Sequence, residues 1–490
     1  MDFRSLRLHR GETTSRPAFL LASISLLIIL LGPVGPAAAQ LAPWPARDVD
    51  YPIDSGWRSH PSSGGEQVIW STIVATSDSS WLRLFFDDLV LGTDPETFEG
   101  ARLRMTSMDD GASQTLNAIT ASQWQSTSAY FNGDTVVMEL LAPANGGRSR
   151  VKLDRVRAGL LFDGRDTICG DRDDRVLSSD PRIGRGESGC SHWIVEDAHR
   201  CLISAGHCGY AFTVIEFNVP LSDQFGNIRH PAPKDQYAVD PESVQSYYYL
   251  LGDDWGYFGL FPNTETGLTA YQAQDSAFKL TAPPDGPNPE IRLTGYGMVS
   301  DPVDPTWNRA QKTHLGELVN VKGTILEYTA DTTTGNSGSP VIDEASGHAI
   351  GVHTNGGCTR TGGANGGTAV THPGLQDAMT RPLGLCGPYD LDVSPIIAGQ
   401  LCQMRAVGVE PGSVVTFYYT TDGPGKTSAP EFGVDLGLLD PVCLGQALTN
   451  RAGIASLTQR ISTNAARRRI WLQGVTVGRA SKVVEAVVNF

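Results

Sequence analysis

The sequence predicts a mostly β protein with several domains, and three observations support that prediction. The chain has 490 residues, of which 40% are hydrophobic, so it can form packed cores but is too long for a single one. Its 54 glycines and 30 prolines, set against only 8% aromatic residues, suit short strands joined by turns better than long helices. Short runs of β-branched or alternating apolar residues recur along the chain. Together these observations predict roughly two to four domains.

The charge of the chain excludes one class of partner. Its formal net charge is −15 at pH 7. Nucleic-acid phosphates and anionic lipid headgroups repel such a chain, so we expect neither a general nucleic-acid binder nor a protein that adheres to anionic membranes. Acidity alone names no partner.

The N-terminal residues have the pattern of a secretory signal peptide. Four arginines precede an apolar stretch over residues 18–31, and the small residues Ala37-Ala38-Ala39 follow it before Gln40. A basic leader, an apolar segment and an A-x-A cleavage site are typical of exported proteins. The alternative is an uncleaved membrane anchor, but the stretch is shorter than the roughly 20 residues that a spanning helix needs. We therefore expect a secreted, extracytoplasmic protein that loses residues 1–39 and keeps no stable membrane span.

The cysteines fit an oxidising destination. None precedes Cys169, so residues 41–165 must fold without disulfides. Metal ligation by these cysteines is the alternative, but the chain has no C-x-x-C pair, so we expect no zinc. We expect no other cofactor either. The sequence does not decide how all the cysteines pair. They are Cys169, Cys190, Cys201, Cys208, Cys358, Cys386, Cys402 and Cys443.

Residues 40–164 are predicted to form an N-terminal β-sandwich. Runs rich in β-branched residues, or alternating apolar with charged ones, are separated by Gly and Asp turns, which is typical of an antiparallel sandwich with one face in water. The arrangement is loosely similar to CUB-like or jelly-roll binding modules, and a packing or pro-domain is the alternative. The runs are residues 68–74, 81–86, 101–105, 134–141 and 151–156.

Residues 388–490 are predicted to form a C-terminal immunoglobulin-like sandwich. Residues 413–419 and 470–475 have the composition of strands. Cys402 and Cys443 are the only cysteines in this region, and we expect them to pair. The triple arginine 467–469 is more typical of a solvated strand end than of a binding patch. A polymer or surface ligand for the two flanking domains stays open.

The region between them, residues 165–387, contains a candidate nucleophile. Ser337 lies between two glycines in the run Thr334-Gly335-Asn336-Ser337-Gly338-Ser339-Pro340-Val341, so no neighbouring side chain crowds its hydroxyl. The backbone N–H groups of Gly335 and Ser337 face the same space if the turn is tight. Two such donors would form an oxyanion hole, which often contributes most to acyl transfer.

A serine hydroxyl needs a base, and the base needs a carboxylate that holds its tautomer. His207 ends the apolar run Leu202-Ile203-Ser204-Ala205-Gly206 and precedes a cysteine that a disulfide can fix. Asp253 and Asp254 begin an apolar strand further along. The residues alone do not choose between these two carboxylates.

Three segments together resemble the chymotrypsin-like serine endopeptidases, and most of all the secreted bacterial branch that includes the glutamyl endopeptidases. They are Ala205-Gly206-His207-Cys208, Asp254-Trp255 and Gly335–Pro340. The resemblance covers residues 165–387 and implies two antiparallel β-barrels with the site between them. It implies that His207 is the general base, Asp254 its partner and Ser337 the nucleophile. The family's aspartate directly precedes a bulky apolar residue, which favours Asp254 over Asp253. The resemblance also implies a Cys190–Cys208 disulfide.

The resemblance implies a specificity pocket formed by Asp331, Thr332, His353 and Thr354. Thr332 and His353 match a hydroxyl residue and a histidine with which the glutamyl branch receives an acidic side chain. Asp331 matches an aspartate that trypsin-like enzymes use for Lys or Arg. A carboxylate beside a bound glutamate would repel it. We predict an acidic preference on the condition that Asp331 points out of the pocket, and a basic preference is the alternative. A satisfied core histidine is the structural alternative for His353.

One acidic cluster precedes the barrels. Asp171, Asp173, Asp174 and Asp180 lack the spacing of a calcium-binding loop, so we interpret them as a solvated acidic loop and expect no metal.

The sequence therefore predicts a mostly β fold, with a double antiparallel β-barrel protease domain flanked by N-terminal and C-terminal β-sandwich domains. The predicted function is hydrolysis of peptide bonds in protein or peptide substrates through a His–Asp–Ser triad and an acyl-enzyme. The alternative from another class is an extracellular binding or adhesion protein whose central domain is inactive.

Overall fold

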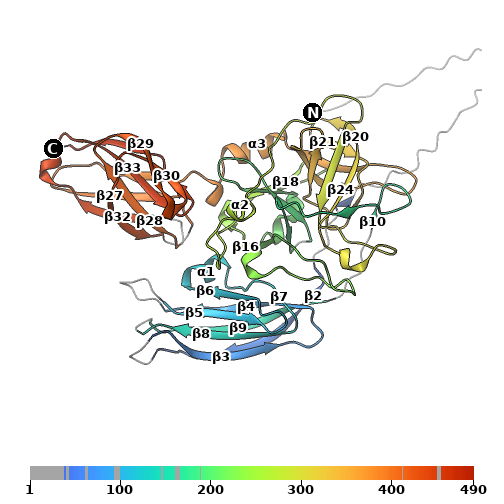
Figure 1. Ribbon diagram of the computed structural model, residues 1–490, viewed down its shortest axis with the longest axis horizontal. Coiled ribbons are helices and arrows are strands. Elements are labelled where there is room, and N and C mark those ends of the chain that lie inside the picture. The colour runs from blue at the N-terminus through green and yellow to red at the C-terminus, as the bar shows by residue number, and fades with distance from the viewer. Residues whose placement is uncertain are drawn as a thin grey trace, which may run out of the picture. The chain divides into compact units, whose positions relative to one another are not determined.

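The computed structural model describes residues 38–39, 44–60, 65–92, 100–144, 147–160, 166–187, 189–410, 412–449 and 454–489. The predicted signal peptide lies outside these ranges, except for Ala38 and Ala39. Strands dominate the described residues (Figure 1). None of the helices in these ranges is long and apolar enough to cross a membrane.

The N-terminal region forms two antiparallel four-stranded sheets, in the orders β2-β9-β4-β7 and β3-β8-β5-β6 (Figure 1). In β5 and β8, alternate side chains such as Leu103, Met105 and Met138 are buried, as expected for strands with one face on a core. The elements are β2 (Ala46–Asp54), β3 (Gln67–Ala75), β4 (Trp81–Val90), β5 (Arg102–Ser107), β6 (Ser113–Leu116), α1 (Ala118–Gln123), β7 (Phe131–Asn132), β8 (Thr135–Ala142) and β9 (Arg150–Gly159).

The central region begins with a seven-stranded sheet in the order β16-β15-β12-β13-β14-β18-β17. This sheet curls so that the chain just after β16 meets the chain just after β18, at an antiparallel bridge between Val239 and Leu260. Its strands are β12 (Ile183–Gly186), β13 (Ser191–Ile194), β14 (Leu202–Ser204), β15 (Val214–Glu216), β16 (Gln236–Ala238), β17 (Gln245–Tyr248) and β18 (Asp254–Phe258).

A second barrel follows and is closed by its own pairings. Its strands run in the order β24-β23-β19-β20-β21-β25, and β24 also pairs with β25. The core of this barrel contains Leu293, Leu326, Val341 and Ile350, all of them buried. The strands are β19 (Glu290–Gly295), β20 (Lys312–Lys322), β21 (Ile325–Tyr328), β23 (Pro340–Asp343), β24 (Ala349–Gly356) and β25 (Asn365–Ala369). The predicted pair of antiparallel barrels is confirmed.

Shorter elements complete the central region. The two-residue strand β22 (Thr332–Thr333) pairs with β10 (Asp166–Thr167), and β11 (Val176–Leu177) pairs with β20. The α-helices are α2 (Ala270–Gln274) and α3 (Pro373–Thr380). The 3-10 segments are η1 (Gly206–Ala211), η2 (Pro233–Asp235), η3 (Pro241–Ser243), η4 (Pro305–Trp307) and η5 (Gly384–Cys386).

The C-terminal region contains antiparallel sheets in the orders β26-β27-β32 and β31-β28-β33-β34, with β35 also paired to β33 and a separate β29–β30 hairpin. Phe417 and Leu472 belong to its hydrophobic core. The elements are β26 (Asp390–Val393), β27 (Leu401–Val407), β28 (Val414–Thr420), β29 (Pro424–Ala429), η6 (Pro430–Phe432), β30 (Val434–Leu438), β31 (Val442–Leu448), β32 (Ala455–Arg460), η7 (Thr463–Ala465), β33 (Arg469–Thr476), β34 (Arg479–Ala480) and β35 (Val484–Val487).

The predicted Cys402–Cys443 disulfide is wrong. Both thiols are free, Cys402 buried and Cys443 exposed. Cys402 lies in β27, where it pairs with Gln459 of β32, whereas Cys443 lies in β31 opposite Tyr418 of β28. The two cysteines belong to different sheets, and being the only two in a region did not make them neighbours.

Three disulfides join parts of the central region. Cys190–Cys208 is present, as the resemblance implied, and links residues 18 apart in sequence. Cys169–Cys358 and Cys201–Cys386 link residues 189 and 185 apart. The last two pairings, which the sequence left open, tie the start of the central region to its end.

Buried contacts connect the N-terminal sandwich to the first barrel. Glu187, in the turn after β12, accepts from Arg83 of β4 at 2.7 Å and from Arg157 of β9 at 2.5 Å. Thr213 Oγ1 donates to the same carboxylate at 2.9 Å. Burial opposes ionisation of Glu187, but the neighbouring arginines lower its pKa to about 2. The two regions therefore share a buried cluster of charges.

Candidate active site

The turn that carries Ser337 runs from β22 to β23, and its glycines set its shape. Gly335 and Gly338 have φ values of 104° and 85°, which residues with a side chain rarely adopt. A Cβ on Gly338 would also lie 2.1 Å from the carbonyl oxygen of Ser191. The Ser337 carbonyl accepts from the Ser191 N–H at 2.7 Å. The turn is therefore fixed against β13 of the first barrel, between the two barrels.

Two peptide planes in this turn are held by hydrogen bonds. The Thr334 carbonyl accepts from the Met298 N–H, and the Asn336 carbonyl accepts from the Ser339 N–H, each at 2.9 Å. In a trans peptide the N–H points away from the carbonyl, so these bonds fix the directions of the Gly335 and Ser337 N–H groups. Neither of these N–H groups donates a hydrogen bond within the described residues. The arrangement can present two donors to an oxyanion.

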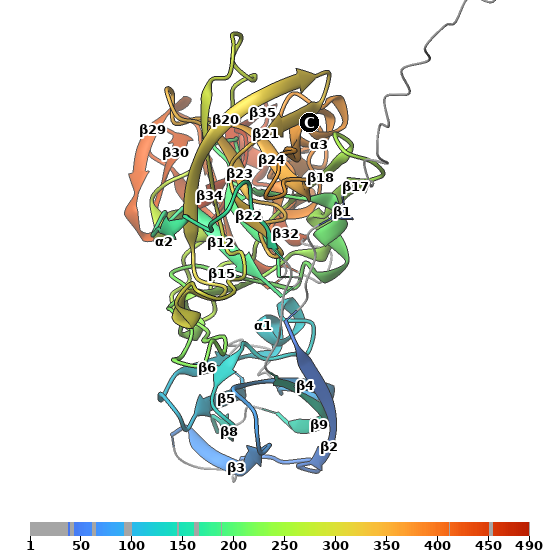
Figure 2. The same ribbon diagram turned by 90° about the vertical axis from the view of Figure 1, so that its right-hand side faces the viewer.

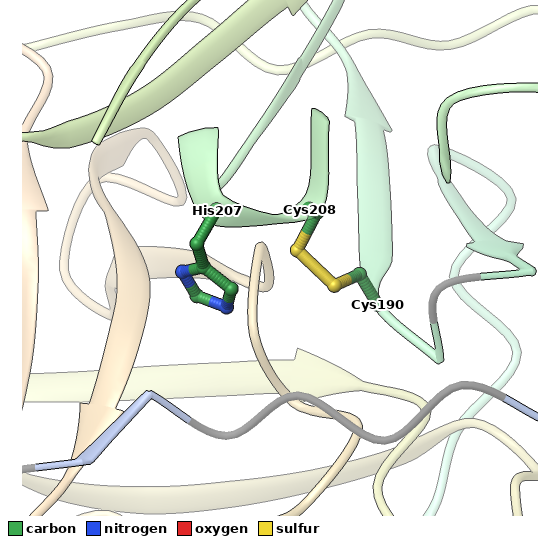
Figure 3. Close-up of side chains that lie close together, drawn as sticks. All are labelled: Cys190, His207 and Cys208. Carbon is green, nitrogen blue, oxygen red and sulfur yellow. A yellow bond between two sulfur atoms is a disulfide. The ribbon is translucent and has the colours of Figure 1, made fainter. Parts of the chain in front are cut away.

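His207 lies in η1, and its imidazole is held by Asp254 at the start of β18. The Nδ1 atom lies 2.6 Å from Asp254 Oδ2, and the His207 N–H donates to Oδ1 at 3.0 Å. Both side chains are buried. Nδ1 therefore carries a proton and Nε2 is left as the acceptor. Figure 3 shows the His207 side chain next to Cys208, whose disulfide with Cys190 fixes this turn of the chain.

The structure distinguishes the two candidate carboxylates. Asp253 turns away from His207 and pairs with His372 at 2.8 Å, and its side chain is 45% exposed. Asp254 is fully buried and its N–H donates to the Thr368 hydroxyl at 3.2 Å. Of these two carboxylates, Asp254 is the one that contacts the His207 imidazole. Thr368 lies in β25 of the second barrel, and nothing near Asp254 in sequence pointed to it.

Ser337 and His207 come near each other without a hydrogen bond. Ser337 Oγ and His207 Nε2 are both buried, and neither has a hydrogen-bond partner among the described residues. Gly338 packs against Ser204 and Ala205, which precede His207 by three and two residues in the chain. A serine and a base in an empty site often sit too far apart for a good bond and come together when substrate binds. Within the described residues, these are the atoms of Ser337 and His207 that remain available to react with a substrate.

One carboxylate oxygen of Asp331 is bonded to the backbone. Its Oδ1 accepts from the Cys169 N–H at 2.7 Å, and its own N–H donates to His314 Nδ1 at 2.8 Å. Burial raises the pKa of this carboxyl to about 6. The next residue, Thr332, begins β22 and is buried. The carboxylate that would favour Lys or Arg is thus engaged with the backbone next to the Cys169–Cys358 disulfide.

His353 and Thr354 lie on β24, directly beside the Ser337 turn. The Gly338 N–H donates to the His353 carbonyl at 2.7 Å, and the His353 N–H donates to the Ser339 carbonyl at 2.8 Å. The Tyr328 hydroxyl lies 2.6 Å from His353 Nδ1. Burial, with a smaller contribution from His207, lowers the pKa of His353 to about 3, so its imidazole is neutral at pH 7. Tyr328, on β21, orients this ring, and sequence reasoning missed it.

Two clusters of metal-ligand side chains do not fit a metal ion. In the first, Cys190 and Cys208 flank His207, but both sulfurs are used in a disulfide (Figure 3). In the second, His314 lies between Asp174 and Asp331. His314 Nδ1 accepts a backbone N–H, so Nε2 carries the proton and faces Asp174 at 2.7 Å. A protonated nitrogen offers no lone pair to a cation.

The acidic loop is less solvated than predicted. Asp173 pairs with Arg175, and Asp180 with Arg182, each two residues along the chain, and the four side chains are at most 22% exposed. Asp171 and Asp174 are exposed, as expected.

The edge of β24 carries a further strand. β23 stops pairing with β24 at Val352, and beyond it β1 (Ala38–Ala39) pairs antiparallel with Asn355 and Gly356 (Figure 2). This segment contains the predicted cleavage site of the signal peptide. Its docking at the candidate active site was not expected from the sequence.

No family model and no curated protein matches the chain. Several solved structures match part of it. A Glu endopeptidase in complex with MPD is 16% identical, covers 44% of this chain and 98% of its own length, and has a TM-score of 0.33. The thermostable serine protease AL20 from an extremophilic microorganism is 18% identical, covers 40% and 94%, and scores 0.32. The protease Anisep from Arthrobacter nicotinovorans is 16% identical, covers 40% and 92%, and scores 0.30.

The central region has two antiparallel β-barrels. Likenesses at this level of identity concern the fold alone. What the barrels do must be argued from the side chains that they bring together.

Buried histidines in the barrels predict that acid destabilises the protein. Burial lowers the pKa of His192 and of His353 from 6.5 to about 3. Between these values the unfolded chain binds protons that the folded chain does not, so the free energy of unfolding falls as the pH falls. Each group contributes a slope of about 1.4 kcal/mol per pH unit.

The variant His192→Phe keeps a ring beside Phe212 and Phe258 and removes one of these titrations. Urea unfolding at pH 7 and pH 5 measures the effect. We expect the variant to lose less stability than the parent over this range, and equal losses would contradict the assignment of a neutral, buried His192.

Proposed function

We propose that the protein is a secreted serine endopeptidase. The observation that carries the proposal is the buried His207–Asp254 pair beside a Ser337 hydroxyl that has no other partner. The Ser337 Oγ attacks the scissile carbonyl while His207 Nε2 takes its proton, and Asp254 stabilises the imidazolium. The N–H groups of Gly335 and Ser337 bind the oxyanion. His207 then protonates the leaving amine, and water hydrolyses the acyl-enzyme.

The proposal extends to a preference for an acidic residue before the cleaved bond. Support comes from Asp331, whose Oδ1 atom accepts from the Cys169 N–H at 2.7 Å. Thr332 and the neutral His353 are the polar side chains that flank the Ser337 turn, and each can donate a hydrogen bond to a carboxylate. The basic preference would need the Asp331 carboxylate in the pocket.

The test uses purified residues 40–490, a fluorophosphonate probe and a peptide library. We expect the probe to add to Ser337 in the wild type and not in Ser337→Ala, and to add normally in the matched control Ser456→Ala, which changes an exposed serine of β32. Cleavage of the library should depend on Ser337 in the same way, with Glu or Asp before the cut. Mass spectrometry of the labelled peptide identifies the modified residue.

Two results would count against parts of the proposal. Absence of labelling and cleavage in folded wild-type protein would reject the endopeptidase and favour a binding protein with an inactive barrel domain. Cleavage after Lys or Arg would keep the enzyme and reject the acidic preference.

A further inference from the structure

The strand β1 lies where an extended peptide would have to bind. β24 carries His353, whose carbonyl accepts from the Gly338 N–H next to the nucleophile, and ends at Gly356. Beyond Val352 the edge of β24 is no longer covered by β23. A strand edge that a neighbouring strand of its own sheet no longer covers can bind an extended peptide through backbone hydrogen bonds. The Asn355–Gly356 segment is therefore the edge on which a substrate chain could align with Ser337.

The chain's own N-terminal segment uses this edge. Ala38 lies opposite Gly356 and Ala39 opposite Asn355, in an antiparallel register. The backbone groups that would bind a substrate are thus engaged with residues of the same polypeptide. A peptide and β1 cannot pair with Asn355 and Gly356 at the same time.

The segment is anchored close to the site. Trp44 is buried, its N–H donates to the Glu187 carbonyl at 3.4 Å, and its ring contacts those of Tyr130 and His230 at 4.9 Å each. Residues 40–43 alone separate this anchor from Ala39. A short tether raises the effective concentration of β1 at the edge to the millimolar range, so even weak pairing can compete with a free substrate.

We propose that residues 38–39 act as an intramolecular inhibitor of the candidate active site, and that removal of the leader through Ala39 opens the edge of β24. This inference rests on the proposed function. Removal is hydrolysis of the peptide bond after Ala39 by a leader peptidase, with water as the second reactant. A chain that begins at Gln40 lacks both residues of β1.

The test compares three chains: one that begins at Gln40, one that begins at Ala37, and the second with both Ala38→Pro and Ala39→Pro, which removes whichever backbone donor of β1 faces β24. Peptide hydrolysis by the Ala37 chain should show a KM raised about tenfold with little change in kcat, independent of enzyme concentration, because the inhibitor is part of the same chain. The chain with both Ala38→Pro and Ala39→Pro should behave like the Gln40 chain. Equal KM values in all three would overturn the proposal.

A second readout does not depend on catalysis. Adjacent amides in a strand point to opposite edges, so only one of the Asn355 and Gly356 N–H groups faces β1 and the other faces β25. In the Ser337→Ala background, hydrogen exchange at the amide that faces β1 should be slower in the Ala37 chain than in the other two. Equal exchange would overturn the proposal even if the enzyme is active. A third outcome is slower exchange in the Ala37 chain, together with no hydrolysis by any chain that keeps Ser337. That outcome would reject the proposed function, because β1 would be bound to β24 without an enzyme to inhibit.

Discussion

Replacing Asp254 with asparagine is expected to lower kcat by about four orders of magnitude while leaving the fold intact. The carboxylate lies 2.6 Å from His207 Nδ1 and so fixes the proton on that atom. An asparagine amide that faces Nδ1 with its NH₂ group would favour the opposite tautomer, in which Nε2 carries the proton and cannot accept one from Ser337. Hydrolysis of a fluorogenic peptide across a range of pH measures the loss.

The matched control is Asp253→Asn, one residue away. Asp253 is partly exposed and pairs with His372 at the start of α3, so its loss should leave kcat within a few-fold of the wild type. Circular dichroism and the thermal midpoint of both variants test whether they fold. Similar losses of kcat in the two variants would mean that Asp254 has no special role in orienting His207.

Replacing Glu187 with glutamine should destabilise the protein by about 3–5 kcal/mol. Arg83 is 4% exposed and bonds Glu187 from the N-terminal sandwich. Without the carboxylate, this guanidinium charge stays buried and uncompensated, which is the costly way to break a buried ion pair. Urea unfolding in the Ser337→Ala background, which prevents self-digestion, measures the change.

The control for that variant is Asp87→Asn, which removes an exposed ion pair with Lys152 on the same sandwich. Its urea midpoint should match that of the parent, because exposed pairs contribute little. The pH dependence adds a check. The low pKa of Glu187 contributes stability that is present above its unfolded pKa and is lost as the pH falls toward 2, so the two proteins should converge in acid. A Glu187→Gln midpoint equal to that of Asp87→Asn would contradict the buried-pair argument.

Local patterns in the sequence predicted the strands well. The run 134–141 corresponds to β8 (Thr135–Ala142), and the run 470–475 corresponds to β33 (Arg469–Thr476). Alternation of apolar residues with period two is visible in the sequence itself, so strands of this kind can be predicted. The resemblance favoured Asp254 over Asp253, and Asp254 is the one that lies 2.6 Å from His207 Nδ1.

Features that depend on distant pairings were not predictable from one sequence. Thr368 and Tyr328 reach Asp254 and His353 from other strands of the second barrel, and short polar or aromatic residues of this kind occur throughout the chain. The Cys402–Cys443 prediction failed for the same reason, because proximity in a region says nothing about which sheet a residue joins. The docking of β1 on β24 has no periodic signal, since two alanines suit many environments.

The two long disulfides determine what happens to this chain when it is cut. Every peptide bond between Cys201 and Cys358 lies inside the loops closed by both Cys169–Cys358 and Cys201–Cys386. A nick in that stretch leaves both fragments joined covalently, with His207 on one and Ser337 on the other if it falls between them. On a gel without reductant the nicked protein would migrate near the intact one, and only reduction would release the pieces. A sample judged whole by such a gel can already contain molecules with a broken backbone.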